Sequence, residues 1–237
     1  MQRLSIVVFV LLLCGGCQER ESVITIVDIG RNNRLEIGKQ LRIINQFSPK
    51  IVALDFFLVP DSLSQDTILV KELNRITNSV QVVALHDFNE PLDCWDSLEI
   101  SHSKFTISNY GFANITTTEE DTTFVRELPL KQCFNGKWVY SFSYVVAENS
   151  FGVKTKYRNS GTTGIKFDLS NIGNYFNIIS REDLDNGEFN KSDFDGKIVI
   201  LGYIGNDDDH FKVDGLGQMS INGVIIQAAI INEIIDL

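Results

Sequence analysis

The chain has 237 residues, of which 43% are hydrophobic and 22% are charged, and its formal net charge is −10 at pH 7. This composition is typical of one globular domain that is large enough to fold without metal or disulfide staples. Because an acidic surface repels phosphate backbones and no cluster of lysine and arginine interrupts it, we predict no nucleic-acid partner.

The start of the chain has the three-part form of a secretory signal peptide. Arg3 supplies a positive charge, Ile6–Leu13 is an apolar run, and small residues follow up to Cys17. The run is shorter than the roughly 20 apolar residues that a transmembrane helix needs. We therefore predict a signal peptide over residues 1–16 and a single extracytoplasmic domain over residues 17–237.

The next segment alternates between strand and helix patterns. Val23–Ile29 is rich in β-branched residues and predicts a strand, and a helical apolar stripe follows over residues 35–47. Ile51–Leu58 is almost wholly apolar, as expected for a parallel strand covered on both faces. Gln65–Ile76 predicts a second helix and Val80–Leu85 a third strand. The short connections favour a right-handed β-α-β-α-β unit with a parallel sheet.

The periodicity breaks up in the middle of the chain, between Phe88 and Gln132. The short extended pieces Gly111–Ile115 and Phe124–Leu130 predict an antiparallel excursion beside the parallel sheet. Trp138–Glu148 predicts a helix because its large apolar side chains recur at helical spacing, although its aromatic and β-branched content also allows a strand.

The last third of the chain returns to core elements. Ile165–Leu169 predicts a strand, and Arg181–Phe189 predicts a helix with Ser180 as its N-cap. Lys197–Tyr203 reads as another core strand, and Gly223–Ile235 reads as a closing helix that is apolar nearly all round. The predicted fold class is therefore α/β, with a parallel β-α-β core sheet and an antiparallel β excursion in the middle of the chain.

Cysteine usage leaves two interpretations open. The domain contains Cys94 and Cys133 besides Cys17, and an exported compartment permits a disulfide between the first two. Two free thiols, one of them buried, are an equally good interpretation, because the spacing decides nothing. Cys14 and Cys17 have C-x-x-C spacing, but a redox pair is expected where a helix opens after a strand.

Acids and histidines lie toward the carboxyl ends of four of the predicted core strands. They are Asp28, Asp55, His86, Asp209 and His210. Because ligands of open parallel sheets bind outside the carboxyl ends of the strands, these groups predict a site for a cation or a polar ligand. The alternative is that they cap helices and bond to loop amides. The identity of any metal stays open, since neither a calcium loop nor a zinc-ligand spacing is present.

The common catalytic motifs are not present in the sequence. The glycine pairs that start at Gly202 and Gly215 do not open a helix, as a dinucleotide fingerprint requires. Ser160-Gly161 lacks the spacing of a nucleophile elbow. We therefore predict no catalytic activity and no cofactor, with a metal-dependent hydrolase that uses the strand-end carboxylates as an alternative.

Six phrases, taken in order, resemble the second type of CHASE domain, an extracellular sensing module found in front of bacterial histidine kinases and nucleotide cyclases. The phrases are VITIVDIG from Val23, SPKIVALDFFL from Ser48, GFANI from Gly111, FVRELPL from Phe124, FDGKIVILGYIG from Phe194 and INGVIIQAAIINEII from Ile221. The resemblance spans about residues 23–236. The chain departs from the family at Gln227, where the family has a histidine, and in its aspartate-rich loop, which lacks the family's Thr-Pro.

This resemblance implies a sensory or ligand-binding domain without catalytic activity, with an extracellular or periplasmic ligand and a membrane signalling partner. It also implies structural roles for Gly111, Gly196 and Gly223, which lie within its phrases. Arg126 stands shortly before a proline in the fourth phrase, and we expect its guanidinium to lock the antiparallel excursion onto the parallel core. The alternative for Arg126 is a solvated arginine on a strand face.

Leu13–Cys17 resembles the lipobox of bacterial lipoproteins, which implies cleavage before Cys17 and a lipid on its sulfur. The protein would then be a membrane-anchored lipoprotein of the bacterial cell envelope. Cys14 stands where the lipobox usually has leucine, so an uncleaved signal anchor is the alternative. The alternative function is a structural or partner-binding lipoprotein with no small ligand.

Overall fold

The computed structural model describes most of the chain. The described residues are 22–31, 33–59, 66–105, 107, 109–115, 124–125, 128–152, 164–165, 176–205, 210–213 and 220–235. Their helices are α1 (Arg34–Ile44), α2 (Asp66–Leu73), α3 (Phe142–Phe151), α4 (Arg181–Asn186) and α5 (Gly223–Ile235), with 3₁₀ turns at Glu90–Leu92, Ser103–Phe105 and Lys191–Asp193. Their strands are β1 (Ile24–Asp28), β2 (Ile51–Leu54), β3 (Ser79–Asn89), β4 (Cys94–Glu99), β5 (Tyr110–Phe112), β6 (Phe124–Val125), β7 (Leu128–Pro129), β8 (Lys131–Phe134), β9 (Lys137–Tyr140), β10 (Gly164–Ile165), β11 (Phe176–Ile179), β12 (Ile198–Gly202), β13 (His210–Val213) and β14 (Ser220–Asn222).

A nine-stranded sheet forms the centre, in the order β11-β1-β12-β2-β3-β4-β8-β9, and β5 pairs with β3 beside this path. Strands β11, β1, β12, β2 and the first part of β3 are parallel. β12 lies between β1 and β2, so that Ile200 pairs with Ile26 on one side and with Ala53 on the other. This arrangement confirms the predicted α/β class and its parallel core sheet.

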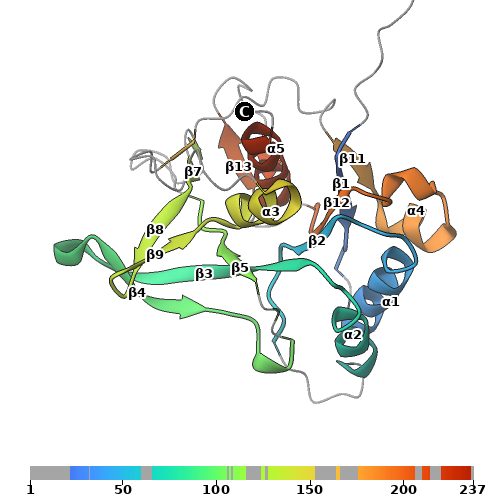
Figure 1. Cartoon of the computed structure of the whole chain (residues 1–237), viewed down its shortest axis with the longest axis horizontal. Helices are drawn as coiled ribbons and strands as arrows, with labels where there is room; N and C mark the ends of the chain where they lie inside the picture. Colours follow the sequence, from blue (N-terminus) through green and yellow to red (C-terminus); the bar gives the residue numbers. More distant parts are fainter. Residues whose placement is uncertain are drawn as a thin grey trace, which may run out of the picture.

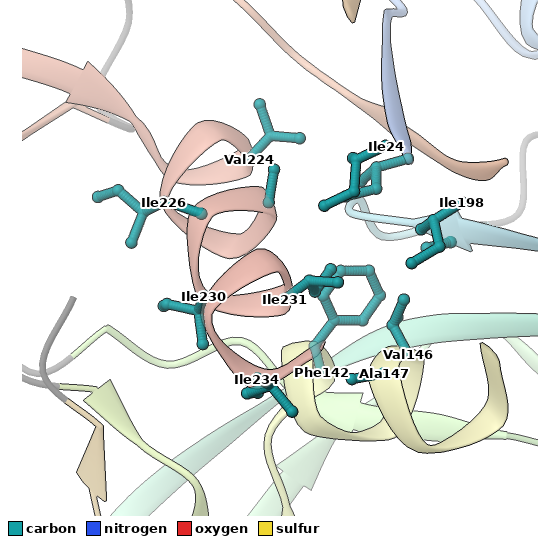
Figure 2. Close-up of a cluster of buried hydrophobic side chains, with 14 of the residues drawn as sticks. Ile24, Phe142, Val146, Ala147, Ile198, Val224, Ile226, Ile230, Ile231 and Ile234 are labelled. Atoms are coloured by element: carbon teal, nitrogen blue, oxygen red, sulfur yellow. The ribbon is translucent and has the colours of Figure 1, made fainter. Parts of the chain in front are cut away.

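Helices cover both faces of the parallel strands (Figure 1). Because successive side chains of a strand point to opposite faces, the buried strand residues divide between two apolar clusters. Ile24 and Ile198 pack with α3 and α5 in the cluster of Figure 2, whereas Val27 and Leu201 pack with α1 and α2. Burial on both faces explains why these strands appear in the sequence as continuous apolar runs.

The sheet changes character halfway along β3. The start of β3 pairs in parallel with β2, and Ala84–Asn89 pairs in antiparallel fashion with β4. The β8–β9 hairpin then joins β4, and Cys94 and Cys133 form a disulfide whose Cα atoms are 4.6 Å apart. This antiparallel extension, made of Ala84–Asn89, β4, β8 and β9, projects to one side of the core (Figure 1). The prediction of antiparallel pairing in the middle of the chain is confirmed, but its assignment to Gly111–Ile115 and Phe124–Leu130 was wrong. β5 pairs in parallel with β3, β6 pairs in parallel with β13, and β7 pairs with β10 in a separate sheet.

The prediction of one helix over Trp138–Glu148 was wrong in its first part, which forms β9. Asn135 and Gly136 have φ of 48° and 74°, the left-handed conformation that a tight hairpin between β8 and β9 requires. Ser141 then caps α3 by accepting the backbone N–H of Tyr144. The Asn-Gly pair is a hairpin signal in the sequence, and the following aromatic and β-branched residues fit a strand.

Other element ends also differ from the prediction. α4 ends before Phe189, because Gly187 has φ of 76° and closes the helix. β2 stops at Leu54, whereas β3 continues past Leu85 because β4 pairs with its second half. The bounds of strands therefore depend on their pairing partners as well as on their own sequence.

The three glycines with predicted structural roles lie in different settings. A Cβ atom on Gly111 would lie 2.5 Å from the Cα atom of Phe142, so that only glycine lets β5 approach the start of α3 this closely. Gly196 has φ of 71° in the turn before β12, and Gly223 is the first residue of α5. The geometry therefore demands glycine at position 111 and favours it at position 196.

Candidate functional site

The carboxyl ends of β1, β12 and β2 form one edge of the parallel sheet. Asp28 ends β1, and Asp55 directly follows β2. β12 lies between them, with Gly202 opposite Asp28 and Leu201 opposite Leu54. Because neighbouring strands lie about 4.8 Å apart, the backbones that carry the two aspartates are about 10 Å apart. The two acids thus share an edge but lie on strands that are not neighbours.

The side chain of Asp28 bonds to the backbone of two loops. Its Oδ1 atom accepts the N–H of Gly30 at 2.9 Å and the N–H of Ile204 at 3.0 Å. These bonds fix the segments that follow β1 and β12. They fit the alternative interpretation of the strand-end acids, in which a carboxylate bonds to loop amides.

A hollow of about 330 Å³ opens beside Asp55. Its walls are Asp55–Phe57 after β2, Val82–Ala84 in β3, Ala113–Ile115 after β5, and Gly223 and Gln227 in α5. The walls come from four segments that are far apart in the sequence, so the hollow exists only in the assembled fold. Most of its lining is apolar, with a carboxylate and side-chain amides at defined places, which is the usual make-up of a small-molecule site.

Gln227 is the buried polar residue on the α5 wall. The hydroxyl of Ser143 in α3 lies 2.5 Å from its Oε1 atom and 3.1 Å from its backbone oxygen. Its Nε2 atom donates a long hydrogen bond, 3.5 Å, to the backbone oxygen of Ala113. The amide therefore has a fixed orientation, with its oxygen toward α3 and its nitrogen toward the segment after β5.

Asn114 shapes the wall that follows β5. Its Nδ2 donates to the backbone oxygen of Leu85, and its Oδ1 accepts the N–H of the same residue, both at 2.8 Å. This pair continues the β3–β5 pairing beyond the end of β5. Phe56 is half-buried and packs against the apolar cluster of α1 and α2, whereas Phe57 is exposed; both residues line the hollow.

A family model described as the CHASE2 domain matches residues 21–237, nearly the whole chain. The chain belongs to the CHASE2 family. This match confirms the resemblance drawn from the six phrases. CHASE2 domains are extracellular sensory domains associated with signalling proteins. Comparison of the chain with curated proteins and with solved structures gave no match.

His86 lies away from the carboxyl edge of this CHASE2 domain. Leu54 pairs with Gln81, which places His86 about 17 Å further along β3 than the end of β2. There it pairs with Ser97 in the antiparallel extension, and its Nε2 atom is 3.0 Å from Oε2 of Glu99. The strand continues past the predicted end, and this continuation separates the histidine from the aspartates.

Of the remaining predicted site residues of the CHASE2 domain, only His210 lies in the part of the chain that the structure describes. His210 begins β13 and pairs with Asn222, the residue before α5. Asp209, Arg126 and Cys17 lie outside the described residues. Their predicted roles in ligand binding, in locking the excursion and in lipid attachment stay predictions.

Among the described residues, no group of three or more His, Cys, Asp and Glu side chains is arranged to hold a metal ion. Within that same part of the chain, no helix has the length and apolar character needed to cross a membrane.

Proposed function

We propose that this CHASE2 domain is a non-catalytic sensor that binds a small organic molecule in the hollow beside Asp55. The hollow of about 330 Å³ at the carboxyl edge is the observation that carries this proposal. It lies where ligands of open α/β sheets collect, and its lining has the apolar walls and few polar groups that such ligands use. A signalling partner in the bacterial cell envelope would read the bound state.

The lining suggests the chemistry of the ligand. Asp55 offers a carboxylate that accepts hydrogen bonds, and the Gln227 amide has an orientation fixed by Ser143. Val82 and Ile115 add apolar surface to the lining. A molecule with a hydrogen-bond donor at one end and an apolar body matches this arrangement.

Helix α5 is the element that would carry the signal. Its first turn lines the hollow, and Val224 in that turn packs tightly on β12, where a Cβ atom on Gly202 would lie 2.5 Å from the Val224 Cγ2 atom. A ligand that favours one position of α5 therefore changes the packing of the central sheet strand. The ligand can shift the equilibrium between two positions of α5 only if it binds the domain more tightly in one of them.

A thermal-shift screen tests the proposal. The purified full chain is heated with a panel of amino acids, small amines and carboxylates. A compound at about 100 times its Kd adds about 2.7 kcal/mol to the free energy of unfolding, which raises the Tm of a domain of this size by roughly 5–10 °C.

The matched variants are Ala113→Leu, which fills the hollow, and Ser192→Leu, which adds the same bulk at an exposed turn. We expect Ala113→Leu to remove the shift and Ser192→Leu to keep it. A panel without any shift, or a shift that survives Ala113→Leu, overturns the proposal.

The exposed end of the antiparallel extension favours a second candidate, a partner-binding lipoprotein. Phe88 and Leu92 are 45% and 68% exposed at the tip of the β3–β4 hairpin. Exposed apolar groups on a projecting element are common at protein interfaces. If no compound shifts the Tm and a Phe88→Ser/Leu92→Ser variant loses signalling in cells while it stays folded, this candidate replaces the sensor.

We further propose that a lipid on Cys17 anchors the domain to a membrane of the bacterial cell envelope. Expression of the wild type and of Cys17→Ala, followed by cell fractionation, measures it. We expect the wild type in the membrane fraction with a mass below that of its precursor. Equal mass and location for both proteins would instead support an uncleaved signal anchor.

A further inference from the structure

A second hollow, which is lined by polar residues, lies at the opposite edge of the parallel sheet, where α1 and α2 end. The buried carboxylate of Glu72 in α2 organises this region. It accepts hydrogen bonds from Nε of Arg42 at 3.2 Å and from Nη1 of Arg75 at 3.1 Å. Asn45 adds its side-chain amide at 3.1 Å from the Glu72 backbone oxygen. Three side chains from the ends of the two helices thus bond to Glu72.

The burial of these groups is uneven. The Glu72 side chain is 0% exposed, whereas those of Arg42 and Arg75 are 48% and 56% exposed. A guanidinium has five N–H donors in a planar fork, and Glu72 engages only the inner ones. The carboxylate therefore holds both guanidiniums in place while their outer donors face the surface.

The surface in front of these donors is hollowed. A hollow of about 460 Å³ is lined by Arg42, Asn45, Gln46 and Arg75, so all of its lining residues carry donors and none is acidic. The two guanidiniums and the Glu72 carboxylate together carry a net charge of +1, in a chain whose net charge is −10. A positive, donor-lined hollow on an acidic protein selects anions.

A neighbouring hollow of about 240 Å³ shares Asn45 and Arg75 with the first one. Its other polar lining residues are Ser48, Thr77 and Asn78, which are uncharged. A ligand that spans both hollows would place an anionic group against the guanidiniums and an uncharged polar body beside the hydroxyls and amides.

We propose that Arg42, Arg75 and Gln46 form a binding site for an oxyanion group, phosphate or carboxylate, of a small polar ligand. Two planar forks match the geometry of such a group, because each can bond two of its oxygens. Glu72 pre-organises both forks, which lowers the entropy cost of binding. One bound monoanion also neutralises the cluster. This site is independent of the hollow beside Asp55.

Titration of the purified full chain with sodium phosphate, sodium sulfate and sodium acetate tests the proposal by calorimetry. Sodium chloride at equal ionic strength corrects for general screening. We expect saturable binding of phosphate or acetate in the millimolar range or below. The absence of saturable binding of these anions up to tens of millimolar overturns the proposal.

Three variants locate the binding. Arg75→Lys keeps a cation for Glu72 but loses the planar fork, so we expect affinity to fall about tenfold. Gln46→Leu removes one donor that does not bond to Glu72, and we expect a loss of about threefold with unchanged stability. Arg181→Lys is the control, since Arg181 is a similarly exposed arginine paired with Asp185 in α4. Equal affinity of wild type and Arg75→Lys would contradict the site.

A phosphate group could belong to a soluble molecule or to a lipid headgroup. Glycerol phosphate and a short-chain phosphatidylglycerol below its micelle concentration separate these sources. Tighter binding of the lipid assigns the site to a membrane headgroup, whereas tighter binding of glycerol phosphate assigns it to a soluble ligand. If neither compound competes with inorganic phosphate in the wild type, the proposed ligand class is wrong.

Discussion

The two edges of the parallel sheet carry hollows of opposite character. At the carboxyl edge, four distant segments enclose a mainly apolar space with the acid Asp55 on its wall. At the amino edge, the ends of α1 and α2 enclose a wholly polar space with the cations Arg42 and Arg75. One sheet therefore separates an acidic, apolar site from a basic, polar one.

Helix direction explains this difference. In a β-α-β unit each helix ends near the start of the next strand, so the negative ends of the α1 and α2 dipoles meet at the amino edge. Arg42 lies in the last turn of α1, and Arg75 follows α2 by two residues. The two arginines stabilise these helix ends because they face the negative ends of the dipoles. Their outer N–H donors are available to a ligand. The carboxyl edge has no such requirement, and apolar loops can enclose it.

Removal of the disulfide tests whether the site at the carboxyl edge depends on the antiparallel extension. Both contain part of β3. The bond closes a loop with a sequence separation of 39 residues. In the chain-entropy account, Cys94→Ser/Cys133→Ser lowers the free energy of unfolding by about 4 kcal/mol. Urea unfolding of both proteins measures this loss. Ligand affinity at both hollows should stay the same, and a parallel loss at the Asp55 hollow would show that the extension supports it.

Replacement of Gly111 disturbs the carboxyl edge directly. A Cβ atom there meets the backbone of Ser141 and Phe142 at 2.5–2.8 Å, which neither strand nor helix can relieve locally. We expect Gly111→Ala to cost about 3 kcal/mol of unfolding free energy. Gly152→Ala is the matched control, because Gly152 has φ of 66° with nothing nearby, and strain alone should cost about 1 kcal/mol. Equal costs at the two positions would refute the close-contact argument.

Neutralisation of Glu72 disturbs the amino edge. Glu72→Gln loses charge-assisted hydrogen bonds with two arginines, so we expect a loss of about 2 kcal/mol at pH 7 by chemical unfolding. Glu36→Gln, which removes an exposed pair with Lys39, should cost less than about 0.5 kcal/mol.

The loss at Glu72 should depend on pH. Burial alone would raise the pKa of Glu72, but hydrogen bonds from Arg75, Asn45 and Arg42 outweigh it and lower the pKa from its ordinary value of 4.5. A carboxyl with a lowered pKa stabilises the fold above its unfolded-state pKa, and this contribution disappears as the pH falls through the folded-state value. The difference between wild type and Glu72→Gln should therefore be full at pH 7 and shrink below pH 4.5. A pH-independent difference would contradict the charge-based explanation.

The smallest predicted effect concerns the orientation of Gln227. Ser143→Ala removes the hydroxyl 2.5 Å from the Gln227 Oε1 atom, so we expect a loss of about 1 kcal/mol in unfolding free energy. Ligand affinity at the carboxyl edge should fall as well, since the amide is then free to rotate. Ser150→Ala serves as control, because its hydroxyl bonds only within α3, to the Val146 oxygen. An unchanged affinity for Ser143→Ala would remove Gln227 from the site.

The sequence predicted the parallel core because its signals are local. β-branched apolar runs such as Ile51–Leu54 mark strands covered on both faces, and the stripe of α1 marks the helix between them. The position of β12 between β1 and β2 has no local signal. The hairpin before α3 does have a local signal, the Asn135-Gly136 pair. The helical spacing of the apolar residues that follow this pair led to the wrong prediction of a helix.

The candidate sites were less predictable, because side chains meet there across long distances in the sequence. Asp55 could be placed at the carboxyl edge from its strand, but the bonds from Gly30 and Ile204 to Asp28 depend on the neighbouring loop. Glu72 resembles an ordinary surface residue in the sequence of α2. In the fold it is completely buried and bonds to Arg42 and Asn45 at the end of another helix.

The place of β12 also determines when the domain can fold. β1, α1, β2 and α2 come first in the chain, yet their two strands cannot pair with each other, because Ile200 must lie between Ile26 and Ala53. Pairings between such distant segments make folding slow, since a long loop has to close before they form. A chain in which β12 has not yet docked therefore exposes the open edges of two apolar strands, and such edges favour aggregation until β12 is in place.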